Sequence, residues 1–153
     1  MWFIRSLILS LFFVSSMSLA KKQSFYFEPN LSKLSGTIAL VTFPGAPNYS
    51  NIKDGDETET GAYLVLDEPI DVKLVPKIQM GNDEPESNVT IIQLVPQNDN
   101  DWKKLKNGHY VHITGTLFHA VWAHHHTRVL LHAKEIQVTS KKKNMSNKHL
   151  HWS

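Results

Sequence analysis

The histidines of GTLFHAVWAHHHTRVLL, residues 115–131, are the side chains of this sequence best suited to chemistry. Histidine is the commonest metal ligand, because its neutral ring nitrogen is available near neutral pH. If the segment is extended, alternate residues share a face, so His124 and His126 point together and His125 points away. His119 precedes the bend and could approach from the partner strand. The spacing therefore predicts a three-histidine set, His119, His124 and His126, able to hold Zn²⁺ with an open coordination position.

A structural or ligand-contacting role for these histidines is the alternative. Histidine is suited to hairpin ends, where a ring nitrogen can fix a loop by bonding a backbone group. The chain has no cysteine and no H-E-x-x-H motif that would demand a metal. Carboxylates that could complete a metal site occur in a separate loop, at Asp54, Asp56 and Glu57. The sequence leaves both alternatives open, and Zn²⁺ is the only cofactor that it suggests.

A second candidate site is the loop that begins FPGAPNY, residues 43–49. Pro44 and Pro47 fix φ and restrict the unfolded chain, while Gly45 permits a tight turn or a close backbone approach. A preorganised loop beside a histidine-rich hairpin would make a recognition surface. The residues expected to contact a ligand or partner are Phe43, Pro44, Pro47, Asn48, Tyr49, Asp56, Glu57, His125 and Thr127. The alternative is a rigid loop that closes one end of a barrel.

Signals for an enzyme are weak. The chain has no G-x-S-x-G elbow, no phosphate-binding P-loop and no dinucleotide fingerprint. A pair such as His125 and Glu57 could act as a general base only if folding brings the two side chains together. We therefore expect a protein that is not an enzyme, and no catalytic residue is assigned.

The elements that must position these residues are short strands. Apolar and polar residues alternate with period two in five segments: 34–45, 62–75, 88–97, 109–120 and 127–138. Loop-forming residues separate the segments, and residues 98–108 have room for one helical turn. Glycines inside two strands, Gly36 and Gly115, are typical of sharply bent barrel strands. The pattern predicts an all-β fold, a small five-stranded OB-like barrel, with a small β-sandwich as the alternative.

The two ends of the chain differ from this domain. Residues 1–20 carry Arg5, a short apolar run and small residues, which predicts a cleaved secretory signal peptide. We expect a lead-in segment at 21–33, the barrel at 34–138 and a basic, disordered tail at 139–153. The apolar run is short for a membrane span, so no transmembrane segment is expected after cleavage. Without cysteine the domain must fold by packing alone, which favours a bacterial periplasmic or secreted protein.

The charge distribution argues against nucleic acid as a partner. Arg5 and four tail lysines account for five of the 16 Lys and Arg residues, which leaves 11 in residues 21–140. All 14 Asp and Glu lie in the same range, so the domain is mildly acidic. A nucleic-acid-binding surface is expected to be basic.

Two segments resemble a known family. Residues 43–70, with F-P-G-x-P-N-Y followed by G-D-E, and residues 115–131, with G-T-L-F-H-A and H-H-H-T-x-V-L-L, are similar to the bacterial domain of unknown function DUF4431. The resemblance covers roughly residues 34–136. It implies a secreted bacterial protein with an OB-like β fold and no established activity.

Together these features predict a binding protein. We expect a secreted, periplasmic, non-enzymatic module that recognises an unidentified protein or small molecule, of which an inhibitor or immunity protein is one subtype. The alternative is a histidine-rich metal-binding protein or a metal-dependent enzyme.

Overall fold

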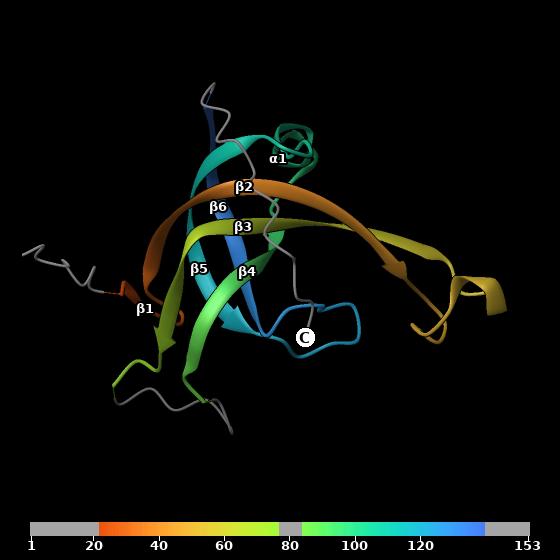
Figure 1. The fold of residues 1–153 in the computed structure, drawn as a ribbon, viewed down its shortest axis with the longest axis horizontal. Coiled ribbons are helices and arrows are strands. Elements are labelled where there is room, and N and C mark those ends of the chain that lie inside the picture. The colour runs from red at the N-terminus through yellow and green to blue at the C-terminus, as the bar shows by residue number, and fades with distance from the viewer. Residues whose placement is uncertain (1–21, 77–83, 140–153) are drawn as a thin grey trace, which may run out of the picture.

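A computed structural model describes residues 22–76 and 84–139 of the chain (Figure 1). The predicted signal peptide and all but the first residue of the predicted tail lie outside these residues. The elements are β1 (Ser24–Tyr26), β2 (Leu31–Pro44), the 3₁₀ turn η1 (Ile52–Asp54), β3 (Thr58–Lys73), β4 (Glu86–Pro96), α1 (Asp99–Lys104), β5 (Tyr110–His119) and β6 (Val129–Thr139). Among the described residues, no helix is long and apolar enough to cross a membrane.

Five of the strands form a closed barrel. β2 pairs antiparallel with β3 and β5, β3 with β4, and β5 with β6, while β4 and β6 are parallel and close the ring. The short helix α1 connects β4 to β5 (Figure 1). This arrangement confirms the predicted all-β, OB-like barrel, and the sandwich alternative is not adopted.

The predicted lead-in segment contains strand structure. β1 pairs in parallel with the end of β3, and β2 begins at Leu31, before the predicted start of the domain. Phe27, between them, is only 5% exposed and belongs to the main core. The physical reason is burial: an aromatic ring removed from water stabilises the contact between this segment and the barrel.

Two glycines allow neighbouring strands to approach closely, as their mid-strand positions predict. A Cβ atom at Gly36 would overlap the carbonyl oxygen of Val65, and one at Gly115 would overlap that of His132. The β5–β6 register also shifts between Thr114 and Gly115. These positions give β2 and β5 the sharp curvature that closes a small barrel.

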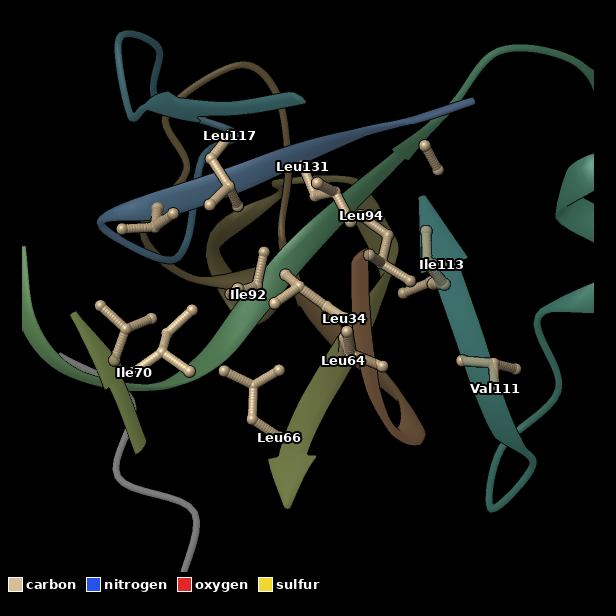
Figure 2. Close-up of a cluster of buried hydrophobic side chains, with 14 of the residues drawn as sticks. Leu34, Leu64, Leu66, Ile70, Ile92, Leu94, Val111, Ile113, Leu117 and Leu131 are labelled. Atoms are coloured by element: carbon tan, nitrogen blue, oxygen red, sulfur yellow. The ribbon is translucent and has the colours of Figure 1, made fainter. Parts of the chain in front are cut away.

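The barrel interior is filled by aliphatic side chains from every barrel strand, including Leu34, Leu64, Ile92, Ile113 and Leu131 (Figure 2). Their alternate neighbours face outward, as the period-two pattern requires.

A smaller buried cluster, Ala39, Tyr63 and Ile91, forms separately from the main core and includes partly buried Phe43 at its edge. Ile91 belongs to this smaller cluster, whereas Val89, two residues earlier on β4, packs in the main core. The β3–β4 register shifts opposite these residues, between Val65 and Ile70, where β3 carries extra residues.

Helix α1 forms where one helical turn was predicted. The side chain of Asn98 accepts a hydrogen bond from the backbone N–H of Asp101, which caps the helix. Leu105, just after the helix, is buried in the main core, whereas Trp102 is 41% exposed. The helix therefore anchors to the barrel through Leu105 and presents Trp102 at the surface.

Candidate functional site

The two predicted recognition loops connect neighbouring pairs of barrel strands. Residues 45–57, the proline loop, join β2 to β3, and residues 120–128, the histidine loop, join β5 to β6. In OB-like barrels the equivalent loops flank the face formed by the second and third barrel strands, here β3 and β4. The structure therefore places both candidate motifs beside the face where such barrels commonly bind ligands.

The proline loop is organised around Asp56. Its carboxylate accepts hydrogen bonds from the backbone N–H groups of Asn48, Ser50 and Asn51, at 2.9, 2.8 and 2.9 Å. The side chains of Asn48 and Ser50 donate two more, at 3.1 and 3.2 Å. These donors, above all the N–H groups of Asn51 and Ser50, hold the pKa of Asp56 well below its usual range. Asp56 is only 5% exposed, so its carboxylate serves the loop itself.

The other predicted residues of this loop have mixed surroundings. Asn48 is a partner of Asp56, and Glu57 is bound through its backbone to Gly45 and Ala46. Tyr49 is 37% exposed, at a φ of 54°. The loop extends from the barrel at the end of the long β2–β3 ribbon (Figure 1). Pro44 ends β2 and Pro47 follows within the turn, consistent with a preformed loop.

The histidine loop is held to β4 by Gln93, which the sequence analysis did not single out. The side-chain amide of Gln93 donates to the carbonyl of His124 at 2.9 Å and accepts from the N–H of His126 at 2.7 Å. The buried hydroxyl of Thr127 accepts from the N–H of Gln93 at 3.0 Å and donates to the carbonyl of Val129 at 2.7 Å. A buried glutamine in an otherwise apolar strand was the available signal, since buried amides need partners.

The three adjacent histidines do not continue a strand. Residues 122–128 form turns and bends, and His125 N–H donates to the carbonyl of Trp122 at 2.9 Å. The alternation expected for an extended segment therefore does not apply here. The Nδ1 atom of His125 accepts from the N–H of Val121 at 2.9 Å, which assigns the proton of the neutral ring to Nε2.

The residues predicted as zinc ligands have separate partners. His119 stacks on Phe27 at 3.7 Å between ring centroids, and its Nε2 lies 2.8 Å from the carbonyl oxygen of Glu84. His126 stacks on Phe43 at 4.0 Å. Within the part of the chain that the structure describes, no three His, Asp or Glu side chains are grouped so that they could hold a metal ion. The structure does not bring His119, His124 and His126 together as a ligand set.

The Phe43–His126 stack joins the histidine loop to the end of β2, next to the proline loop. The rings are nearly parallel, at 9°, and Phe43 also contacts Tyr63 edge-on at 5.9 Å. Among the described residues, the buried Nε2 atom of His126 has no hydrogen-bond partner. Burial lowers the pKa of His126, with Glu59 opposing and His124 adding to the shift. Its role is therefore packing by a neutral ring.

A groove of about 530 Å³ opens on the barrel beside the histidine loop. It is lined by residues 59–61 of β3, 93–96 of β4, Trp102 of α1, Phe118 of β5, His132 of β6, and Val121, Trp122, His124 and His125 of the loop. Trp122 is 68% exposed and Val121 is 65% exposed. This groove, with its aromatic and histidine side chains, is the candidate binding site.

Aromatic rings dominate one wall of the groove. Phe118 and His132 stack at 4.0 Å, and His125 meets Phe118 edge-on at 5.8 Å. Burial lowers the pKa of His125, and the neighbouring histidines, His124 first, add to the shift. His125 is therefore neutral at pH 7.

Of the residues proposed from the sequence, His124 and His125 line the groove, and Thr127 holds the loop that carries them. The sequence analysis missed Glu59, Trp102, Phe118, Trp122 and His132, because they come from four elements and one loop that only the barrel brings together. The exposed Val121-Trp122 pair beside the histidines was the local signal available.

The fold and the groove define a class: a small closed OB-like β-barrel with an aromatic, histidine-lined groove. The family described as domain of unknown function (DUF4431) matches residues 91–137, from β4 through the histidine loop to β6, and confirms the resemblance there. The FPGAPNY motif lies outside the matched residues. No curated protein and no solved structure shows a match to this chain.

Proposed function

We propose that this protein is a secreted, periplasmic binding module without catalytic activity, which recognises a protein or small ligand in the aromatic groove. The observation that carries the proposal is the groove itself, with two partly exposed tryptophans, Trp102 and Trp122, on an otherwise well-packed barrel. Large apolar rings left in water around a concavity are typical of binding sites. Inhibition or neutralisation of a partner protein is one form that this role could take.

The arrangement of Gln93 supports binding. Its two side-chain hydrogen bonds hold the backbone of the histidine loop in one conformation, so the rings of His124 and His125 are positioned before a ligand arrives. A preorganised site loses less conformational entropy on binding. The proline loop, held by Asp56, is ordered in the same sense.

The polar groups of the groove favour binding over catalysis. Among the described lining residues, Thr60 carries the one hydroxyl, and it pairs with Thr42 at 2.7 Å rather than with a histidine or carboxylate. Activation of a hydroxyl nucleophile requires an adjacent base. The histidine rings therefore serve better as neutral donors and acceptors than as partners of a nucleophile.

The proposal can be tested by photo-crosslinking in the native host. A benzoylphenylalanine placed at Val121, on the groove rim, should yield a specific crosslinked species, whereas the same group at Val138, 45% exposed on β6, should not. Native mass spectrometry of the purified full chain would detect a retained small ligand. Equal crosslinking at both positions, or no occupant by either method, would contradict the proposal.

A further inference from the structure

We propose that the groove binds an organic cation, either a quaternary ammonium group or a basic side chain of a partner protein. This inference rests on the proposed binding role of the groove and adds the chemistry of its ligand. The observations behind it are the aromatic faces, the sign of the charge within the groove, and the ion pairs formed by neighbouring cationic side chains.

The aromatic rings supply the attraction. Trp102 and Trp122 line the groove together with Phe118. The face of an aromatic ring is negative, and indole is the most effective side chain for holding a cation over its face. Both tryptophans are partly exposed, at 41% and 68%, so ring surface remains available to a ligand.

The charges of the groove have the sign that such a ligand requires. Among the described residues that line it, Glu59 is the one carboxylate and no lysine or arginine occurs. The field of Glu59 extends into the neighbouring structure: burial raises the pKa of Tyr63 and Glu59 adds to that rise, while Glu59 opposes the lowering of the pKa of His126 by burial. An anionic ligand would meet this negative field without a cation to balance it, whereas a cation would be stabilised.

The positive charges near the groove have other partners. Lys104 of α1 forms an ion pair with Asp101 at 2.8 Å, and Arg128 of the histidine loop pairs with Glu86 at 3.0 Å. His125 is neutral at pH 7. Protonation of His125 in acid would oppose a bound cation, so binding should weaken as the pH falls through the lowered pKa of His125.

A matched pair of probes isolates the charge. Choline and 3,3-dimethylbutanol have nearly the same shape, but only choline carries a positive nitrogen. The full chain labelled with 5-fluorotryptophan would be titrated with each probe and followed by ¹⁹F NMR, after assignment of its four tryptophans by single Trp→Phe substitutions. We expect the Trp102 and Trp122 signals to shift, and choline to bind about tenfold more tightly than the neutral isostere.

Variants then test the two sources of attraction. Trp122→Leu should remove most of the preference for choline, while Trp122→Phe should retain part of it. Glu59→Gln should weaken choline binding about threefold without changing the binding of the isostere. Glu68→Gln is the matched control, because Glu68 is an exposed carboxylate of the same strand, β3, that does not line the groove. It should leave both affinities unchanged.

Further probes distinguish the source of the cation. Tighter binding of Nα-acetyl-lysine amide or Nα-acetyl-arginine amide than of choline would identify a basic side chain of a protein, and the reverse order would identify a quaternary ammonium compound. The inference is overturned if dimethylbutanol or a neutral oligosaccharide such as chitohexaose binds as well as the cations, or if no probe shifts the Trp102 and Trp122 signals. An uncharged or anionic occupant in native mass spectrometry would also overturn it, while leaving the proposed binding function intact.

Discussion

The backbones of the proline loop and the histidine loop are held in place by different kinds of contact. Both are irregular segments between long strands, and both depend on one buried polar side chain that organises backbone groups. In the proline loop that side chain is Asp56, which belongs to the loop and bonds residues five to eight positions away. In the histidine loop it is Gln93, which belongs to β4 and bonds residues 31 and 33 positions away.

This difference determines which loop can form a site. The proline loop is self-contained, because the carboxylate of Asp56 accepts hydrogen bonds from the backbone of the same loop. The backbone of the histidine loop is held by Gln93 of β4, so the side chains of the loop remain available to line the groove. Both polar motifs therefore indicate loops with a fixed backbone. Side chains of a loop stay available to line a site only where the group that fixes the backbone belongs to another element, as Gln93 does.

The largest loss of stability is expected when the side chain of Gln93, which holds the histidine loop to β4, is removed. Gln93→Leu leaves the carbonyl of His124 and the N–H of His126 without their partner, which should destabilise the protein by about 2–4 kcal/mol. Ligand binding in the groove should weaken as well. Urea unfolding would measure the first effect, and Gln137→Leu, on an exposed amide of β6, is the control. An unchanged midpoint would mean that the histidine loop is as self-contained as the proline loop.

The next effect concerns the second contact between the histidine loop and β4. Thr127→Val removes a buried hydroxyl that bonds Gln93 and Val129, and it should cost about 1–2 kcal/mol. Thermal unfolding would measure it beside Thr58→Val, at the exposed start of β3. A loss no larger than that of the control would show that Gln93 alone holds the loop.

The ring stack between the histidine loop and the end of β2 should contribute less to stability. Phe43→Leu removes the parallel contact with His126 and the edge contact with Tyr63 while retaining an apolar side chain, so we expect a loss of about 1 kcal/mol. The His126 ring protons should also move downfield when the ring current is lost. If their shifts stay constant, the histidine loop is not held to β2 by this stack.

The two loops should respond to acid at different pH values. His125 and His126 have lowered pKa values in the folded protein, so their contribution to stability is complete above the unfolded value of 6.5 and is lost as the pH falls through the folded values. The lowered pKa of Asp56 acts in the same direction, but only below its unfolded value of 3.8.

Amide resonances measured between pH 7.5 and 4.5 would show which loop responds first. Val121 should change before Asn51 does, because protonation of His125 removes the acceptor for the Val121 N–H. Changes in both loops at the same pH would contradict the prediction that the histidine loop responds first.

The smallest effect on the barrel is expected from the proline loop. Asp56→Ala leaves the N–H groups of Asn48, Ser50 and Asn51 without their acceptor, so cleavage within residues 45–57 by a protease should become faster. Binding in the groove should not change, because none of these residues lines it. Asp54→Asn, on an exposed carboxylate of the same loop, is the control. Loss of groove binding in Asp56→Ala would show that the two loops form one site.

Local pattern was sufficient to predict the five barrel strands, the helical turn near Trp102 and the bends at Gly36 and Gly115. Each of these depends on residues that are close in the chain: period two defines the faces of a strand, and a glycine permits a close approach wherever its strand is placed. The alternation within residues 124–126 was misleading, because those residues form a turn and not a strand.

What only the tertiary structure decided is which side chains meet. The stack of Phe118 on His132 depends on the register of β5 with β6, and the contacts of Gln93 depend on the parallel pairing of β4 with β6. A shift of one residue in either register would turn these side chains to the opposite face. The sequence by itself determined the barrel strands and the positions of the two loops, because these follow from local periodicity and turn chemistry. Barrel closure decided that the histidine loop lines a groove, because that outcome depends on long-range hydrogen bonds and ring contacts.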